Sequence, residues 1–349
     1  MAAMRDVPAR GAPGAQEVPE ATASEASRRP QQTIRRILVP LDGSTYAECA
    51  LPHAVAIAKA FGSRICLLSV GVARHRGVQP ANVAEWRIAR AESQAYLELL
   101  AGSLRAEEIE ADCECAEGRA SEQILRSAAE RGADLIVLSS HGEGGITDFH
   151  MSGTVSKVLE AAPSSLLVVR ANKEPAAPPV PLYSHVMVPV DCTRRSDFAV
   201  HVGSAIARAQ GAKLVLATVI TPPEILGDPR DWAERHEHAV QLVRLNREYA
   251  TRYLDRLASQ VASEKLVIEP RVIDAEHVVK ALQQLAEGEP RSLVALSAHG
   301  GHAGTGWLHG YVPALLLGHS SSPVLVLQDV TRGRWTGPMA RARGSNGGS

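Results

Sequence analysis

Two glycine-rich stretches contain the residues best suited to chemistry. The stretches LSSHGEGGITDFHMSGT (138–154) and LSAHGGHAGTGWLHGY (296–311) each follow an apolar run and contain Ser-x-His-Gly. A glycine-rich loop that ends at a helix start presents free backbone N–H groups, and phosphates usually bind there. Both stretches are therefore candidate phosphate-binding loops, although they differ from each other at the positions where a phosphate would lie.

An aspartate stands at the end of an apolar run in each half of the chain. Asp42 follows ILVPL, and Asp191 follows VMVPV. A carboxylate in this place can contact a ligand, act as a general base, or cap the helix that follows. The pattern leaves ligand contact and helix cap equally open for Asp42, and it favours the cap for Asp191.

The histidines of the two loops have two interpretations. His141 and His299 occupy equivalent positions, where a histidine could contact a phosphate or make the loop sensitive to pH. A loop position that tolerates any polar residue explains them more simply, and we favour that interpretation. A metal site of His299, His302 and His309 would need a loop conformation that the sequence does not define, so no metal site is expected.

Two other clusters have ordinary explanations. Cys113 and Cys115 would share one face of a strand, but no second cysteine pair is present to complete a zinc site. His236 and His238 lie in a helical pattern, where residues two apart do not share a face. The sequence contains no Walker A motif, nucleophile elbow or nucleophile–base–orienter set. No catalytic residues are expected, and the chain is not expected to be an enzyme.

Length and composition limit the classes of protein that remain. The 349 residues suggest two domains, and the net charge of −1 with no long basic run excludes a nucleic-acid footprint. Five scattered cysteines fit a reducing compartment. No run of about 18 apolar residues could span a membrane, so we expect a cytoplasmic protein. The composition of residues 1–32 and 331–349 is typical of disordered tails.

One unit occurs twice in the chain. The motif RRILVPLDGST (35–45) returns as SHVMVPVDCTR (184–194) with an offset of 149 residues. The later motif ADLIVLSSHG (133–142) returns as RSLVALSAHG (291–300) with an offset of 158 residues. The nine extra residues of the second unit must lie between these motifs, and we place them in the long helix around 229–262. Such repeats indicate two copies of one fold.

Within each unit, apolar strand-like runs alternate with helical patterns. In the first unit the alternation begins with a strand in IRRILVPL, an alanine-rich helix in TYAECALPHAVAIAKAFG and a strand in RICLLSV. Ser44 is the expected N-cap of that helix, and Gly62 is its expected end. Alternation of this kind predicts an α/β fold with a doubly wound parallel sheet. Ligands of such sheets bind outside the carboxyl ends of the strands. If the first and fourth strands are neighbours, Asp42 and the first glycine loop face one crevice.

These motifs resemble the universal stress protein family, here as a tandem pair. The resemblance rests on ILVPLDGS, VMVPVDCT, GRASEQIL, ADLIVLSSHGEGG and VALSAHGGHAG. It implies two domains (33–171 and 184–330) joined by a linker (172–183). Each domain would be an open parallel five-stranded sheet with strand order 3-2-1-4-5 and helices on both faces. The resemblance also implies dimer-like packing of the two units across their fifth strands.

Nucleotide-binding members of that family resemble one another in a loop of the form Gly-x-x-Gly, nine residues, then Gly-Ser or Gly-Thr. The first loop departs from this pattern, with Ser139 in the leading glycine position and Ser152-Gly153 in inverted order. A loop longer by one residue would make Gly153 and Thr154 the phosphate pair. In the second loop, Ser297 replaces the leading glycine and Tyr311 replaces the final hydroxyl residue. The second site is therefore expected to be degenerate.

The family resemblance implies a stress-response regulatory module without enzymatic activity. ATP is the possible cofactor, bound in the first domain, and whether Mg²⁺ accompanies it is left open. The alternative is a nucleotide-free scaffold with an unknown protein partner, and further homo-oligomerisation is possible. The candidate nucleotide-binding residues are Pro40, Leu41, Asp42, Val70, Ser139, His141, Gly142, Gly145, Gly153, Thr154, Asp191, Gly300 and Gly310.

Overall fold

A computed structural model describes eight stretches of the chain. They are residues 34–71, 83–142, 151–162, 164–171, 182–193, 196–223, 232–298 and 310–328. The expected tails, residues 172–181 of the expected linker, and the candidate residues Gly145 and Gly300 lie outside the described residues.

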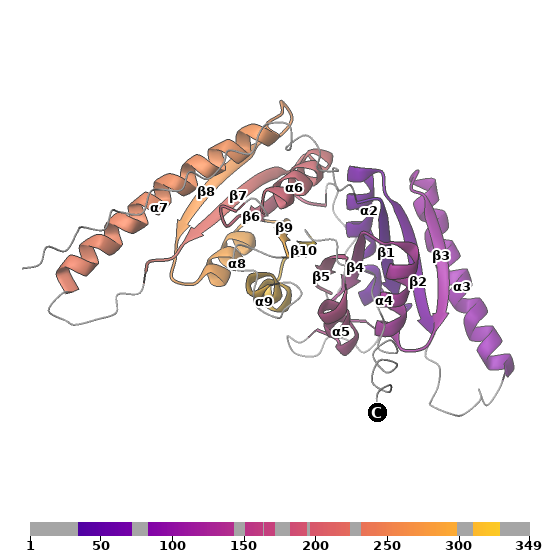
Figure 1. The fold of residues 1–349 in the computed structure, drawn as a ribbon. Coiled ribbons are helices and arrows are strands. Elements are labelled where there is room, and N and C mark those ends of the chain that lie inside the picture. Colours follow the sequence, from indigo (N-terminus) through magenta and orange to yellow (C-terminus); the bar gives the residue numbers. More distant parts are fainter. Residues whose placement is uncertain are drawn as a thin grey trace, which may run out of the picture. The chain divides into compact units, whose positions relative to one another are not determined.

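Strands and helices alternate through both halves (Figure 1). The first half contains β1 (Arg36–Leu41), α1 (Thr45–Glu48), α2 (Leu51–Phe61), β2 (Arg64–Gly71), α3 (Val83–Ala106), β3 (Ala111–Glu117), α4 (Ala120–Arg131), β4 (Leu135–Ser139), α5 (Gly153–Ala161) and β5 (Ser165–Val169). The second half contains β6 (His185–Pro189), α6 (Ser196–Gln210), β7 (Lys213–Ile220), α7 (Trp232–Val261), β8 (Ile268–Asp274), α8 (Val278–Gly288), β9 (Ser292–Ser297), α9 (Tyr311–His319) and β10 (Val324–Leu327).

All described strands belong to one ten-stranded sheet. Its order is β3-β2-β1-β4-β5-β10-β9-β6-β7-β8, so each half has the expected order 3-2-1-4-5. Pairing is parallel within each half, and β5 pairs with β10 in antiparallel direction, with Leu167 opposite Leu325. The expected contact across the fifth strands is therefore confirmed. The two sheets expected from the repeat are continuous, because this contact is a hydrogen-bonded ladder.

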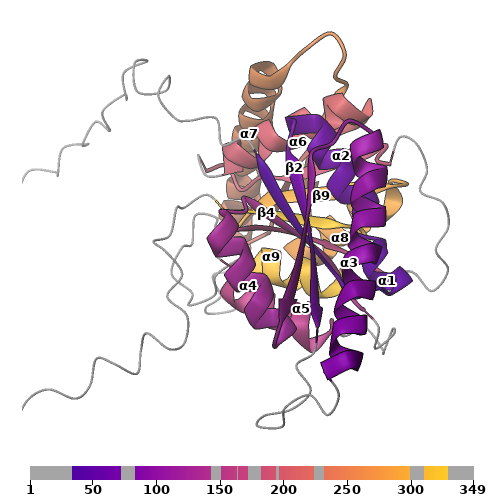
Figure 2. The same ribbon diagram turned by 90° about the vertical axis from the view of Figure 1, so that its right-hand side faces the viewer.

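Helices cover both faces of the first half. In Figure 2, α1, α2 and α3 lie on one side of the strands, and α4 and α5 lie on the other. The side chains of β1 alternate accordingly, since Ile37 and Val39 belong to the same core cluster as Ile57 of α2, whereas Leu38 belongs to the cluster that contains Ile124 of α4. A strand that is covered on both faces needs a continuous apolar sequence, which ILVPL provides.

The alanine-rich segment after β1 differs from the single helix expected there. It forms α1 and α2, separated at Cys49 and Ala50, with Pro52 in the first turn of α2. Proline has no N–H to donate to the carbonyl four residues earlier, so one continuous helix cannot pass through it undisturbed. The expected ends are confirmed. Ser44 accepts a hydrogen bond from the Ala47 amide, and Gly62 ends α2 in the left-handed conformation.

The extra residues of the second half lie mainly where the repeat offsets place them. Helix α7 has 30 residues, whereas its counterpart α3 has 24. The strands before these helices, β2 and β7, keep the offset of 149 residues, and the strands directly after them, β3 and β8, differ by 157. The prediction that the insertion lies in this long helix is confirmed for six of the nine extra residues.

Polar contacts join the two halves beside the β5–β10 ladder. The Arg170 guanidinium donates to the carbonyl of Ser320 (Nε to O 2.8 Å) and to that of Leu317 (Nη2 to O 3.2 Å), at the end of α9. A cation at the carboxyl end of a helix satisfies carbonyls that have no partner within the helix. In α2, the His53 Nδ1 atom lies 2.5 Å from the hydroxyl of Tyr183, which precedes β6.

Candidate functional site

The carboxyl ends of β1 and β4 bring Asp42 and Gly142 into contact. These strands are neighbours, with Ile37 opposite Leu135. A Cβ atom on Gly142 would overlap Oδ2 of Asp42, so a side chain at this position would have to displace the carboxylate. The expected meeting of the strand-one aspartate and the first glycine loop is confirmed as geometry.

Each aspartate builds the turn that starts the next helix. Asp42 Oδ1 accepts hydrogen bonds from the Ser44 amide (3.0 Å) and hydroxyl (2.6 Å), and Ser44 in turn caps α1. Asp191 Oδ1 accepts the same two bonds from Thr193, at 3.1 and 2.6 Å. The cap interpretation thus needs one correction at Asp42, because the N-cap is Ser44 and the carboxylate holds Ser44 in place.

Ser140 connects the elements around the first loop. It is fully buried, and its amide donates to the Val169 carbonyl at the end of β5 (2.7 Å). Its carbonyl accepts from the Ser152 amide before α5 (3.0 Å). Its hydroxyl oxygen accepts from the Ala171 amide (3.1 Å) and lies 2.9 Å from Nδ1 of His141. Ser140 was not among the residues expected at the site, although its place in Ser-Ser-His-Gly could have suggested it.

His141 is buried with one ring nitrogen unsatisfied. Only 7% of the residue is exposed, and Nε2 has no hydrogen-bond partner among the described residues. A buried polar group without a partner costs about 1–3 kcal/mol. The preceding Ser139 is also buried, and its hydroxyl oxygen accepts weak hydrogen bonds from the His141 amide and from the Cys49 thiol, each at 3.4 Å. Burial of His141 argues against the simpler interpretation of a tolerant surface loop.

Helix α5 begins beside this cluster. Ser152 is its N-cap and accepts a hydrogen bond from the Val155 amide (3.3 Å), and Gly153 and Thr154 are its first two residues. Amides of the first helical turn have no partner within the helix, and the helix dipole makes this end positive. A Cβ on Gly153 would meet no atom of the described residues within 4 Å, so packing against them does not require glycine there.

The remaining expected residues of the first site lie along the same edge of the sheet. Pro40 and Leu41 end β1, and Val70 is close to the end of β2. The Leu41 side chain is buried in the core, so only its backbone could meet a ligand. Tyr96 of α3 donates a hydrogen bond to Glu48 of α1 (2.8 Å) nearby. Burial and this carboxylate raise the pKa of the Tyr96 hydroxyl.

The second half has the same frame with different loop chemistry. Ala298 takes the place of Ser140, and its amide still donates to the end of the fifth strand, at the Leu327 carbonyl (2.7 Å). Gly310 precedes α9 with a φ of 66°, and a Cβ there would lie 2.9 Å from the Ala298 carbonyl oxygen. Tyr311 is the first residue of α9 and is 69% exposed, and Pro313 removes one donor from the first turn.

Comparison with known proteins finds two matching segments, one in each half of the chain. The model of the Universal stress protein family matches residues 33–170 and residues 182–328. The chain belongs to the universal stress protein family. A universal stress protein of Thermus aquaticus is 32% identical over 142 residues, which cover 39% of this chain and 99% of that protein. A universal stress protein of Methanocaldococcus jannaschii is 26% identical over 152 residues, covering 42% of this chain and 88% of the relative.

Solved structures of universal stress proteins share the fold over most of the chain. A universal stress protein from Archaeoglobus fulgidus is 15% identical and superimposes with a TM-score of 0.58, covering 85% of this chain and 97% of that one. A putative universal stress protein from Pseudomonas aeruginosa is 20% identical, with a TM-score of 0.57 and coverage of 85% and 94%. Membership of this family identifies the chain as a stress-response protein.

The other clusters of this universal stress protein do not form a metal site within its described part. No group of three or more His, Cys, Asp or Glu side chains in the described residues could hold a metal ion, and Cys113 and Cys115 are free, half-buried thiols. His299, His302 and His309 lie outside those residues.

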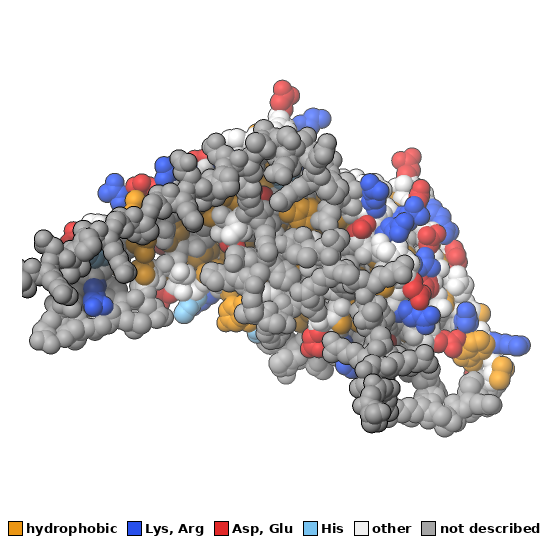
Figure 3. Space-filling model, viewed as in Figure 1, with side chains coloured by type: hydrophobic (Ala, Val, Ile, Leu, Met, Phe, Trp, Pro, Cys, Tyr) orange, Lys and Arg blue, Asp and Glu red, His pale blue; other side chains and the backbone are white. Residues whose placement is uncertain are grey.

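No described helix is both long and apolar enough to cross a membrane. On the face in Figure 3, basic and acidic side chains are interspersed.

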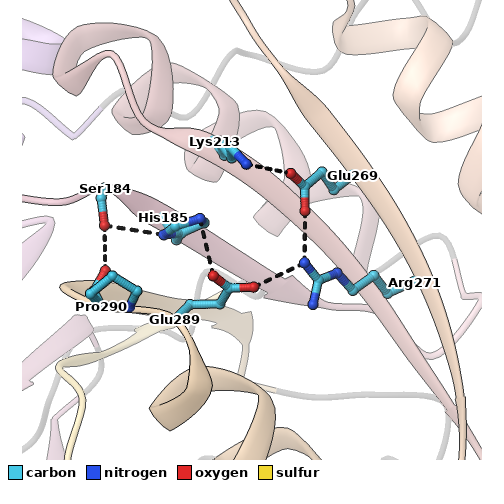
Figure 4. A network of polar contacts seen from close by, with 7 residues as sticks. All are labelled: Ser184, His185, Lys213, Glu269, Arg271, Glu289 and Pro290. Carbon is cyan, nitrogen blue, oxygen red and sulfur yellow. Dashed lines mark hydrogen bonds and ion pairs between the residues drawn. The ribbon is translucent and has the colours of Figure 1, made fainter.

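An ion-pair network lies at the amino ends of the strands in the second half, away from the crevice edge (Figure 4). Glu269 pairs with Lys213 (2.8 Å) and Arg271 (2.7 Å), and Arg271 also pairs with Glu289 (2.9 Å). Hydrogen bonds from Lys213 and Arg271 lower the pKa of Glu269 to about 2. Glu289 reaches His185 as well, at 3.3 Å. This network links β6, β7, β8 and the end of α8, which is a structural role.

Proposed function

We propose that this universal stress protein is a non-enzymatic regulatory module of the cytoplasm that binds ATP, or a similar adenine nucleotide, in its first crevice. The observation that carries the proposal is the convergence of Asp42, Gly142 and the start of α5 at one edge of the sheet. Ligands of doubly wound sheets bind at this edge.

The proposed site divides into two parts. The amides of Gly153 and Thr154, with the positive end of α5, would hold the phosphates. Asp42 would meet the adenosine, as the family resemblance implies, and the backbone at Pro40, Leu41 and Val70 would line that part. Binding would shift conformation or the choice of partner. In the second crevice, Tyr311 and Pro313 leave a poorer anion site, and we propose that it has lost nucleotide binding.

Paired aspartate variants test the proposal. Asp42→Ala and Asp191→Ala remove equivalent turn-forming carboxylates, so both should cost similar stability. Isothermal titration with Mg-ATP should give a dissociation constant below about 1 mM for the wild type. We expect Asp42→Ala to weaken binding at least tenfold and Asp191→Ala to leave it unchanged. Equal losses in the two variants, or no binding by the wild type, would refute the proposal.

A nucleotide-free scaffold is the second candidate. The observation that favours it is the Ser152 side chain, which already caps α5 and occupies the Val155 amide that a phosphate could use. A defined protein partner whose affinity is the same with ATP present and with ATP removed would support this function. A partner affinity that changes with ATP would support the first proposal.

A further inference from the structure

The hydrogen-bond directions around Ser140 determine which nitrogen of His141 carries the proton. The Ala171 amide can only donate, so the Ser140 hydroxyl oxygen accepts that bond at 3.1 Å. The hydroxyl proton of Ser140 then needs an acceptor, because a serine with no exposed surface cannot donate to water. Among the described contacts of this hydroxyl, the acceptor is Nδ1 of His141, which lies 2.9 Å away.

The opposite arrangement leaves more groups unsatisfied. If His141 donated from Nδ1, the Ser140 oxygen would accept two bonds and its own proton would have no partner within the described contacts. The Nε2 atom would then be a buried acceptor without a donor. With the proton on Nε2, the Ser140 hydroxyl is satisfied, and a single buried donor is left for a ligand.

We propose that Ser140 is a positioning residue that accepts no proton from His141 Nδ1 and so places the ring proton on Nε2, and that this N–H donates to a phosphate oxygen of the bound nucleotide. The inference rests on the proposed function, because it assumes a phosphate ligand in the first crevice. It adds one side-chain contact with the phosphates to the backbone contacts that are proposed for the start of α5.

The link to α5 favours phosphate over adenosine as the group that His141 contacts. The Ser140 carbonyl accepts the Ser152 amide, so one residue anchors both the imidazole ring and the helix start. Asp42 approaches the loop at the next residue, Gly142. In the second half, Ala298 provides the same backbone bond, but its side chain has no hydroxyl.

Nuclear magnetic resonance of the full chain tests the proton position without any ligand. Long-range ¹H–¹⁵N correlations distinguish the two neutral tautomers, and the spectrum of His141→Phe identifies the His141 signals. We expect the wild type to show the Nε2–H form and Ser140→Ala to show a mixture. Ser204→Ala is the matched control, since Ser204 is a buried serine of α6 that also donates to one group and accepts from another. An Nδ1–H form in the wild type would overturn the inference.

Ligand titrations test the phosphate contact. Affinities for ATP, inorganic tripolyphosphate and adenosine are compared in the wild type, His141→Phe and His141→Gln. We expect His141→Phe to weaken ATP and tripolyphosphate about tenfold, as the loss of one hydrogen bond to a charged group would do, and to leave adenosine within about twofold. His141→Gln should restore part of the loss, because its amide can donate from a similar place.

The outcomes separate this inference from the proposed function. If the wild type binds ATP and His141→Phe binds it equally well, the role of His141 is overturned and the nucleotide site stands. If adenosine and ATP weaken together in His141→Phe, the ring supports the fold of the loop and does not contact phosphate. If the wild type binds none of the three ligands, the nucleotide proposal and the phosphate contact of His141 are both refuted.

Discussion

The first and second crevices have the same frame and different polar atoms. Both have the aspartate turn after the first strand and the amide bond from the fourth strand to the end of the fifth. The first has a serine hydroxyl at Ser140 that contacts the loop histidine, where the second has Ala298, and only the second begins its helix with an exposed tyrosine. The difference teaches that the sheet and its turns set the shape of a crevice, whereas a few loop atoms decide what can bind.

The ion pairs between the third strand of each half and the end of the next helix give a second comparison. In the first half, Glu114 of β3 pairs with Arg131 of α4 at 2.5 Å. In the second half, Arg271 of β8 pairs with Glu289 after α8 at 2.9 Å, with the signs exchanged. The fold therefore uses an ion pair between the third strand and the end of the next helix, and either order of charges provides it.

The largest expected effect concerns a buried histidine of the first half whose equivalent position in the second half holds a valine. Burial lowers the pKa of His53 to about 4, whereas the equivalent residue of α6 is Val202. Between pH 6.5 and 4 the unfolded chain binds a proton that the folded chain excludes, so the free energy of unfolding should fall by up to about 3 kcal/mol as the pH drops. Urea unfolding across this range should show the loss. His53→Gln should lack it, and an unchanged pH profile would contradict the assignment.

Gly142→Ala should have the next largest effect. The added methyl group would overlap the Asp42 carboxylate and should cost about 1–3 kcal/mol of unfolding free energy, in the range of overpacked sites. Gly153→Ala is the control, since its methyl group would meet no atom in the described part of the chain, and it should be neutral or slightly stabilising. Chemical denaturation of both variants measures the difference, and equal stabilities would refute the close contact.

Exchanging charges should break and then restore the first ion pair. Arg131→Glu places two carboxylates together at partly exposed positions and should cost about 1 kcal/mol. The double variant Glu114→Arg/Arg131→Glu reproduces the order of the second half and should recover most of that loss. A double-mutant cycle in denaturant provides the measurement, and a double variant no better than the single one would contradict the comparison.

The smallest change in stability is expected for the start of α5. Ser152→Gly/Gly153→Ser gives the first loop the order of the family pattern. Replacing a serine N-cap by glycine costs only a few tenths of a kcal/mol, so the melting temperature should hardly move. Nucleotide affinity should rise for two reasons. The Val155 amide loses the Ser152 hydroxyl and becomes available to a phosphate, and the new serine at position 153 adds a hydroxyl beside that phosphate. Thermal shift with and without Mg-ATP measures both effects, and a lower affinity would mean that the native order is the better one.

The sequence predicted much of the fold, because apolar strands, helix caps and a strict repeat each leave a local pattern. The helix ends at Ser44 and Gly62 and the greater length of α7 are confirmed on that basis. It did not predict the interruption at Cys49, where Pro52 outweighs a strong helical composition. It also missed Ser140 and the charge networks, because these depend on which strand ends and helix ends meet in space. The nucleotide-binding roles of the candidate residues remain predictions.

The antiparallel pairing of β5 with β10 also determines how the protein can assemble. In this chain the edge of each fifth strand is occupied by the other half, which is covalently attached and therefore present at high effective concentration. Dilution cannot separate the two halves, and subunit exchange through this edge with a single-domain relative is blocked. A cell that makes this chain obtains the two different crevices in a fixed ratio, whatever the expression level.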